Sequence, residues 1–512
     1  MKPLILFLAA SSALFAAETY RVAGVIVDSE TASPIANASI SLSPYAQSRN
    51  VMVTVSGPDG GFAFDAPRGK YLLTAVIAGR SQLLGEMAPF TGMGEDVIAG
   101  PGQDTTHLVF RWRRPAVVAG RVSDDQDEPV TGALVQVFYP GVADGRRQMR
   151  EVAQVSTDDR GEYRVWGIPG ANYYVKVTAQ PWWPADPPVA YAPVYYPGTG
   201  DASRAALLAV RPGEEVHADF TLTAEPAATV TVNCGNCDAG TAAEGGPRAV
   251  SLTMIEEGLG GTNTPAAGQG VQQWPATVDT VPPGRYLVRL SDEDAANPRV
   301  AEQWIDVGPG KTAVSLSLRP AAVVTGKVTF KSGSPGMVGL AQDTNGEAQW
   351  AQVVQDGTFR IASVPAGKYH VMISGNSYPE IVRAGDEVLP DGVVDVREGV
   401  ETKLSIVVNS GSGSVKGFAV RDGRPVANML VVLVPTGAAG GYPNQGWQTD
   451  SDGSFDWTSM RAGDYLLFAV DDPTIAFADA DVIKPYLSQA KAIRIEPGKT
   501  CEERVPVQST GK

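Results

Sequence analysis

The chain has 512 residues, of which 43% are apolar, 8% aromatic and 19% charged, and its formal net charge is -15. Such a length exceeds what one hydrophobic core organises, and the composition is too apolar for a disordered or coiled-coil chain. Dispersed negative charge repels phosphate backbones, so we expect no nucleic-acid partner. The 56 glycines and 38 prolines follow no collagen-like period, which favours an all-β protein of several domains with many turns.

The amino terminus has the pattern of an export signal. Lys2 provides the positive start, residues 4–10 are mostly apolar, and small residues follow up to Ala17. About a dozen apolar residues are too few to cross a hydrocarbon layer of roughly 30 Å, which favours removal of residues 1–17 over a retained signal anchor. The segment and the residues just after it contain no cysteine, so a lipoprotein anchor is not indicated. We predict an exported protein (periplasmic, cell-surface or secreted) with no membrane span in the mature chain.

Comparison of the chain with itself finds an ordered set of marks that recurs. The first mark is an apolar alternation around a glycine, which is typical of a strand with one buried face and occurs at residues 22–26, 118–122, 324–328 and 415–419. A proline turn, in which Asn or Gly tolerates a positive φ, follows at residues 34–38, 129–133 and 425–429. An Asp/Gly hairpin with an aromatic residue after it comes next, at residues 59–62, 159–163, 356–359 and 452–455.

Two later marks complete each segment. A turn followed by a tyrosine occurs at residues 68–71, 281–286, 364–369 and 461–465, and in a looser form at 168–173. A Pro-Gly or Glu-Gly turn then precedes the last strand. The third segment is the weakest copy, because its opening strand at residues 230–234 lacks the glycine and its Asp/Gly hairpin is missing.

These marks predict an all-β fold, a tandem array of about five small antiparallel β-sandwich domains, each near the size of an immunoglobulin-like sandwich. The short linkers between segments predict semi-independent neighbours with modest contact. Residues 481–491 are predicted to form a short amphipathic helix before the last strand. The predicted divisions are a signal peptide at 1–17 and sandwiches at 18–112, 115–224 (with an aromatic, Pro-rich insertion), 227–320 (degenerate), 321–410 and 412–508.

The order V-x-G-x-V, P-V-x-G-A, D-x-x-G-x-F, V-P-x-G-x-Y and P-G-E resembles the carboxypeptidase regulatory-like domain over nearly all of the mature chain. The resemblance implies a prealbumin-type (transthyretin-like) sandwich, which is related to starch-binding-like, carbohydrate-binding-like folds and to collagen-adhesin B-type repeats. These marks are mostly turn chemistry, so they specify a fold more than a function. In the peptidases that name the family, this domain follows the catalytic one, so the resemblance implies an accessory module without chemistry of its own.

The sequence does not show the spacing motifs that are typical of catalytic residues. The histidines are His107, His217 and His370, one in each of three segments, and none has the H-E-x-x-H or H-x-x-E spacing of a zinc peptidase. A serine or cysteine triad would therefore lack the histidine that usually acts as its base. Ser488 and Lys491 match S-x-x-K, but the companion motifs of that enzyme class are missing. We predict no catalytic residue, no metal ion and no cofactor, and hence a protein that is not an enzyme.

One acidic turn leaves a calcium alternative open. Asp450, Asp452 and Asp456 surround Gly453 at alternate positions, which would supply hard oxygen ligands. The other interpretation is the hairpin turn of the repeat. The distal glutamate of an EF-type loop is replaced by Arg461, which favours the turn.

The cysteines predict a local disulfide. Cys234 and Cys237 follow a strand, and an Ala/Gly/Glu-rich stretch rather than a helix comes after them, so the helix dipole that activates redox pairs is missing. Outside the cytoplasm a disulfide is favoured over a redox or metal role. Cys501 is then the odd cysteine, either a free thiol or a site of intermolecular pairing.

The insertion in the second segment has the only binding character that we find. Its aromatic residues lie on a proline-rich loop, and such rings grip the apolar faces of sugars or peptides. The alternative is that the rings cap the open end of their own sandwich. The candidate ligand-binding residues are Trp182, Trp183, Tyr191, Tyr195 and Tyr196.

Three functions remain in competition. The first is a non-catalytic, multidomain scaffold or adhesion protein of the bacterial cell envelope, motivated by tandem repeats, export and missing catalysis. The first alternative is a carbohydrate-binding protein that uses the aromatic loop, and the second is an accessory protein to a secreted peptidase. We expect a monomer with a protein or polysaccharide ligand.

Overall fold

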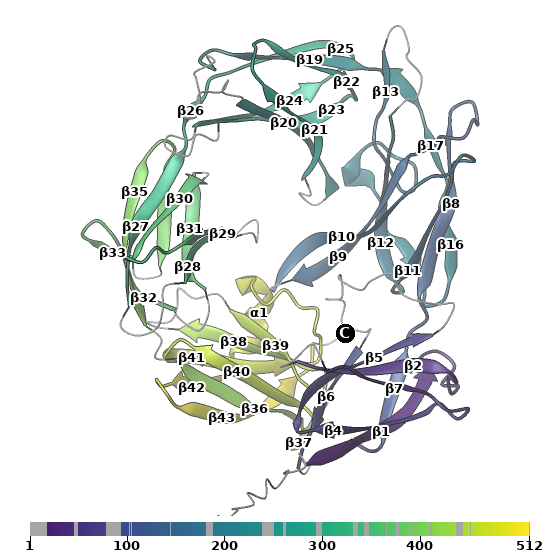
Figure 1. The fold of residues 1–512 in the computed structure, drawn as a ribbon, viewed down its shortest axis with the longest axis vertical. Coiled ribbons are helices and arrows are strands. Elements are labelled where there is room, and N and C mark those ends of the chain that lie inside the picture. The colour runs from purple at the N-terminus through teal and green to yellow at the C-terminus, as the bar shows by residue number, and fades with distance from the viewer. Residues whose placement is uncertain are drawn as a thin grey trace, which may run out of the picture. The chain divides into compact units, whose positions relative to one another are not determined.

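The computed structural model describes residues 18–510 except 46–49, 78–93, 102, 104, 144, 181–187, 238–249, 260–262, 293–298, 331–335, 343–347, 365, 375–377, 390–391, 410–411, 437–443 and 451. The predicted signal peptide at 1–17 lies outside this part. The described chain is built almost entirely of strands (Figure 1), which agrees with the predicted all-β tandem array. None of its helices has the length and apolar character needed to span a bilayer.

The first sandwich belongs to one compact unit and pairs two sheets. One sheet has the order β4 (Gly61–Pro67), β1 (Thr19–Asp28), β7 (Leu108–Trp112). The other has the order β3 (Met52–Val55), β2 (Ala38–Pro44), β5 (Gly69–Ile77), β6 (Gly94–Ala99). Buried residues of both sheets, from Val22 to Trp112, form its core.

The second to fifth sandwiches belong to the other compact unit. In the second, one sheet has the order β11 (Glu162–Ile168), β8 (Ala116–Asp124), β16 (Glu215–His217), and β17 (Phe220–Leu222) pairs further along β8. The other sheet has the order β10 (Arg146–Ser156), β9 (Leu134–Ala143), β12 (Ala171–Thr178), β14 (Val194–Tyr195), and β15 (Leu208–Val210) also pairs with β12. A short 3-10 helix, η1 (Ala202–Arg204), follows β14.

The third sandwich pairs a small sheet with a larger one. The small sheet has the order β22 (Ala276–Val281), β19 (Ala228–Cys234), β25 (Gly310–Leu316). The larger has the order β21 (Asn263–Val271), β20 (Val250–Glu257), β23 (Gly284–Asp292), β24 (Arg299–Val307), β26 (Arg319–Pro320). Their buried residues, from Ala228 to Leu318, form a separate core.

The fourth sandwich also has its own core, from Ala322 to Val408. One of its sheets has the order β30 (Thr358–Val364), β27 (Ala322–Phe330), β35 (Glu401–Asn409), β32 (Tyr378–Ala384), β33 (Glu387–Leu389). The other has the order β29 (Ala348–Gln352), β28 (Met337–Gln342), β31 (Gly367–Ile373), β34 (Val393–Val396).

The fifth sandwich differs because a short parallel pairing between β41 and β43 connects its layers. Its strand order is β37 (Arg424–Pro425), β36 (Gly413–Arg421), β43 (Thr500–Gln508), β41 (Gly463–Val470), β38 (Leu430–Thr436), β39 (Gln445–Gln448). In addition, β40 (Ser454–Met460) pairs with β36, and β42 (Lys491–Ile495) pairs with β41. The predicted helix is present as α1 (Ala480–Leu487), but it ends before Ser488, and Lys491 begins β42 instead.

In every sandwich the opening strand pairs antiparallel with the hairpin strand and parallel with the closing strand. The repeated glycine lies in the opening strand, and a Cβ there would lie only 1.7 to 2.3 Å from a carbonyl oxygen of the closing segment. The repeated aromatic residue is its cross-strand partner. The four pairs are Gly24 with Phe62, Gly120 with Tyr163, Gly326 with Phe359, and Gly417 with Phe455. Two marks that are distant in sequence therefore form one packing unit.

The repeated tyrosine also has a fixed role. Its hydroxyl donates to the backbone carbonyl four residues earlier, as in the tyrosine corners of other sandwiches. These hydrogen bonds join Tyr71 to Pro67 (2.8 Å), Tyr173 to Pro169 (2.5 Å), Tyr286 to Pro282 (3.0 Å) and Tyr465 to Arg461 (2.8 Å). This mark thus locks the turn that leads into the central strand.

The proline turns have the backbone that the sequence predicts. Asn37, Gly132 and Asn428 have φ of 58°, 73° and 60°, which confirms the expected positive φ. Each turn is also held by a serine or threonine hydroxyl that the sequence pattern did not predict. Thr157 Oγ1 donates to the Val130 carbonyl at 2.6 Å and accepts from the Ala133 N–H at 2.9 Å. Ser56 and Thr449 make the same two contacts in the first and fifth sandwiches.

Candidate functional site

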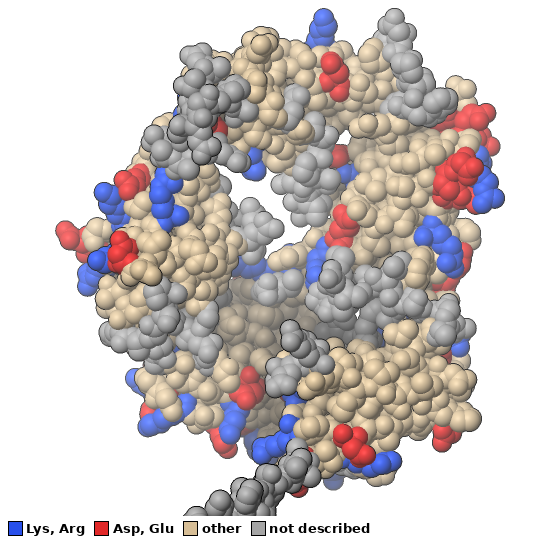
Figure 2. All heavy atoms as spheres, in the orientation of Figure 1, with Lys and Arg blue, Asp and Glu red and all other residues tan. Residues whose placement is uncertain are grey.

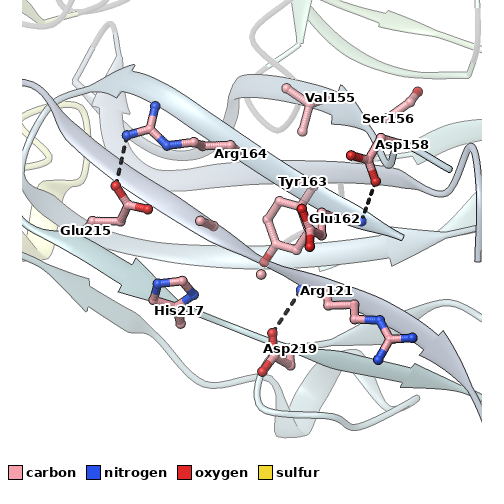
Figure 3. Close-up of a pocket in the computed structure, with 12 residues that line it drawn as sticks. Arg121, Val155, Ser156, Asp158, Glu162, Tyr163, Arg164, Glu215, His217 and Asp219 are labelled. Atoms are coloured by element: carbon pink, nitrogen blue, oxygen red, sulfur yellow. Dashed lines mark hydrogen bonds and ion pairs between the residues drawn. The ribbon is translucent and has the colours of Figure 1, made fainter. Parts of the chain in front are cut away.

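The second sandwich carries an open pocket of about 660 Å³ on the outer face of the sheet β11-β8-β16 (Figure 3). Alternation along β11 builds this face, because Glu162, Arg164 and Trp166 point outward while Tyr163 and Val165 are buried. The pocket is lined by Ala119, Gly120, Arg121, Val155, Ser156, Asp158, Glu162, Tyr163, Arg164, Glu215, His217 and Asp219.

The strand register explains which side chains meet. Glu162 lies opposite Arg121, and Arg164 lies opposite Ala119, across β11 and β8. On the other side of β8, His217 of β16 is in register with Ala119. The outer face therefore carries acidic and basic groups from three strands around Ala119. Because the side chain of Ala119 is small, a depression forms at this position.

Ion pairs and backbone hydrogen bonds hold the charges of this pocket. Arg164 Nη2 donates to Glu215 Oε2 at 2.8 Å, and this hydrogen bond lowers the pKa of the Glu215 carboxyl. Asp158 Oδ1 accepts the backbone N–H groups of Glu162 and Arg160, both at 2.9 Å, and these bonds lower the pKa of Asp158. Both carboxyls are consequently ionised at neutral pH and are poor general acids.

The pocket's hydroxyl groups are not arranged for acyl or glycosyl transfer. Burial raises the pKa of the Tyr163 hydroxyl, which donates to the Ala218 carbonyl at 2.6 Å. Ser156 and His217 lie on opposite sides of the pocket (Figure 3), so they do not form a nucleophile and base pair. An open face with matched charges of both signs suits contact with an extended polar partner better than enclosure of a small substrate.

The structure describes three of the five predicted ligand-binding aromatics. Trp182 and Trp183 lie outside the described residues. Tyr191 and Tyr195 are each only 2% exposed, and Tyr196 is partly buried. A ring with so little exposed surface offers no face to a sugar, so the packing interpretation is favoured for Tyr191 and Tyr195.

The two neighbouring cysteines are joined. A disulfide links Cys234 to Cys237, with the Cα atoms 5.4 Å apart, and Cys237 is buried in the third core. Between them, the Asn236 amide donates to the Leu318 carbonyl and accepts the Leu318 N–H, both at 2.8 Å. The loop is thereby fastened to the end of its sandwich. Cys501 is a partly buried free thiol, and burial raises its pKa.

The other polar candidates lie apart. His107, His217 and His370 belong to the first, second and fourth sandwiches. Asp456 is exposed on β40 opposite Lys416, whereas Asp450 and Asp452 precede Gly453 in the turn. Within the described ranges, no three His, Cys, Asp or Glu side chains are grouped to hold a metal ion.

Fold and surface together define a class, an all-β protein of tandem sandwiches with charges of both signs interspersed on the face seen in Figure 2. No protein-family model matches the chain, and no curated protein matches it. Among solved structures, a minor pilin of Streptococcus agalactiae is similar at 13% identity, 40% coverage of this chain, 97% of that chain, and a TM-score of 0.23.

Two further solved structures are similar at the same distant level. A streptococcal ancillary pilin has 10% identity, with 59% of this chain and 99% of that chain covered, at a TM-score of 0.20. Hydroxyquinol 1,2-dioxygenase from Pseudomonas putida has 16% identity, with 22% and 57% covered, at a TM-score of 0.13. TM-scores this low carry no argument about what the chain does.

Proposed function

We propose that the chain is an exported, non-catalytic scaffold protein whose five sandwiches, at residues 18–112, 115–224, 227–320, 321–410 and 412–508, present outer faces to a protein partner. The observation that carries the proposal is the use of the repeated residues. The glycine and aromatic pairs, the tyrosine corners and the hydroxyl-held turns all act inside their own sandwich. The repeated residues therefore support each sandwich from within, which leaves the outer faces free to differ between copies.

The face most suited to a partner is that of the second sandwich, which we call the β11 face: Arg121, Glu162, Arg164, Trp166, Glu215 and His217. Trp166 is 37% exposed and lies on β11, the strand that also carries Glu162 and Arg164. Tryptophan and arginine are enriched among residues that dominate binding at protein interfaces. The charged neighbours would add specificity and orientation rather than most of the affinity.

The rival functions make different demands on the molecule. A polysaccharide site would depend on Trp182 and Trp183, since Tyr191 and Tyr195 are buried. The resemblance to the carboxypeptidase regulatory-like domain supports a third option, an accessory to a secreted peptidase, in which the partner of the β11 face is that enzyme.

Site-specific photo-crosslinking in the producing cell tests the scaffold proposal. A photoreactive amino acid replaces Trp166 in one strain and Trp350, which is 41% exposed on the fourth sandwich, in a matched control. We expect a discrete protein adduct from position 166 that disappears when Arg164→Ala and Glu215→Ala are added. Absence of a discrete adduct at 166, or the same adducts from both positions, would contradict the proposal.

Two binding and activity measurements address the rivals on the purified protein. A glycan array with the parent chain and a Trp182→Ala, Trp183→Ala variant tests the polysaccharide alternative. Specific binding that the variant loses would replace the scaffold proposal. Turnover on a broad hydrolase panel by the metal-free protein would overturn the statement that the chain is not an enzyme.

A further inference from the structure

Part of the outer face of the sheet β10-β9-β12-β14 in the second sandwich, on strands β9, β12 and β14, is buried, which is unusual for the solvent side of a sandwich. Its outward side chains include a lysine and a glutamine as well as aromatic rings. Gln136 is 4% exposed, Phe138 3%, Lys176 2% and Tyr195 2%. Because Val135, Val137, Val175 and Val177 fill the inner face of the same strands, β9 and β12 are covered on both sides at this place.

Part of the cover comes from the third sandwich. Leu259, which follows β20, is 5% exposed and forms a cluster with Phe138 and Tyr195. Lys176 Nζ lies 2.7 Å from Glu256 Oε2 at the end of β20, and these side chains are only 3% and 15% exposed. A lysine this buried needs its partner, and the partner belongs to the next sandwich.

The segment that connects the two sandwiches is held as well. It forms β18 (Ala224–Pro226), which pairs antiparallel with β13 (Val189–Tyr191) of the aromatic insertion. One residue later, the Ala227 N–H donates to the Pro188 carbonyl at 2.9 Å. One of the short linkers between the predicted segments, at 224–226, is thus a strand that pairs with the insertion.

We propose that the second and third sandwiches form one fixed body, and that strand β13 of the aromatic, Pro-rich insertion holds the segment that connects them. Leu259, Phe138 and Tyr195 supply the apolar contact that favours closure. The Lys176–Glu256 pair adds little net stability but selects one orientation, because any other leaves a charge buried without a partner. The inference goes beyond the scaffold proposal and does not depend on which partner binds the β11 face.

A distance distribution between two spin labels tests the joint in the full chain. The free thiol is removed by Cys501→Ser, and labels are placed at Arg160→Cys and Lys311→Cys, exposed positions on the second and third sandwiches. Pulsed electron paramagnetic resonance then reports the distance between them. We expect one narrow peak. A broad or multiple distribution in this parent protein would overturn the proposal.

Variants connect the peak to the named contacts. Leu259→Asp places a carboxylate against Phe138 and Tyr195 and should abolish the single peak. The matched control is Arg289→Ala, which breaks the exposed Arg289–Glu302 pair of the third sandwich (2.6 Å, 43% and 41% exposed) and should leave the peak unchanged. Hydrogen exchange in β20 and β23 checks that the third core remains folded. An unchanged peak in folded Leu259→Asp would overturn the assignment of the joint to this cluster.

Discussion

The second and third sandwiches solve the same packing problem with different residues. In the second, Gly120 lies opposite Tyr163 across β8 and β11, and in the third, Val232 lies opposite Ala276 across β19 and β22. A glycine and a large ring in one copy correspond to a medium and a small side chain in the other. The third sandwich thus lacks both marks together, which shows that they are one matched pair rather than two independent turn signals.

The largest expected effect comes from breaking that pair in the second sandwich. Gly120→Val would place a Cβ 2.1 Å from the Ala218 carbonyl oxygen, the atom that also accepts the hydrogen bond of the Tyr163 hydroxyl. We expect a loss of about 3 kcal/mol in the stability of this sandwich, because a closely packed strand pair cannot accommodate the added atoms. Native-state hydrogen exchange of the β8 amides measures the loss locally within the full chain.

The third sandwich provides the reciprocal change. Val232→Gly alone should cost about 2 kcal/mol through the cavity it leaves, and adding Ala276→Tyr should recover part of that loss. Additive effects of the two substitutions in a double-mutant cycle would contradict the matched-pair interpretation.

The hydroxyl that holds the proline turn gives the next effect. Thr157→Val keeps the shape of the side chain but leaves the Val130 carbonyl and the Ala133 N–H without this partner, for a cost of about 2 kcal/mol. The fourth sandwich, without the proline-turn mark, has Val353 four residues before its hairpin glycine, the spacing of Thr157 to Gly161. Val353→Thr should therefore destabilise that sandwich. A gain in stability there would show that the hydroxyl acts independently of the turn.

Loss of the tyrosine-corner hydrogen bond should lower stability less, and by the same amount in the second and third sandwiches. The tyrosine corner is present in both, so Tyr173→Phe and Tyr286→Phe should each cost about 1 kcal/mol, the value of one hydrogen bond. Exchange of the amides in β12 and β23 reports the two losses. A large difference between them would mean that the degenerate copy holds its turn in another way.

An effect of similar size, which depends on pH, is expected in the first sandwich. Burial opposes ionisation of Asp28, but hydrogen bonds from Arg114 and from the N–H groups of Thr31 and Glu30 outweigh it and lower the pKa to about 2. An unfolded aspartate titrates near about 3.9, so this stabilisation is complete above about pH 5 and is lost as the pH falls toward 2. Arg114→Ala should cost about 1 kcal/mol at pH 7 and weaken the dependence on acid, measured by denaturant unfolding.

The sequence predicted the fold class because turns and alternation are local signals, and Asn37 has the positive φ that was expected. The structure adds the reason why Gly120 and Tyr173 recur, which is a close strand approach for the glycine and a hydrogen bond for the tyrosine. Thr157 was missed, although Ser56 and Thr449 precede their hairpin glycines by the same spacing. The burial of Lys176 could not be predicted, because its partner Glu256 belongs to another sandwich. Pocket residues such as Arg164 and Glu215 meet only through strand register, which leaves no short motif.

Hydrogen exchange measured by mass spectrometry over residues 18–512 tests the central claim most directly. If each sandwich buries its own apolar face, the opening strands β1, β8, β19, β27 and β36 should form five separate blocks of slow exchange, divided by fast-exchanging turns. A proposed sandwich whose opening strand exchanges at the rate of its turns would have no core of its own, and the account of a repeated, non-catalytic support would be wrong.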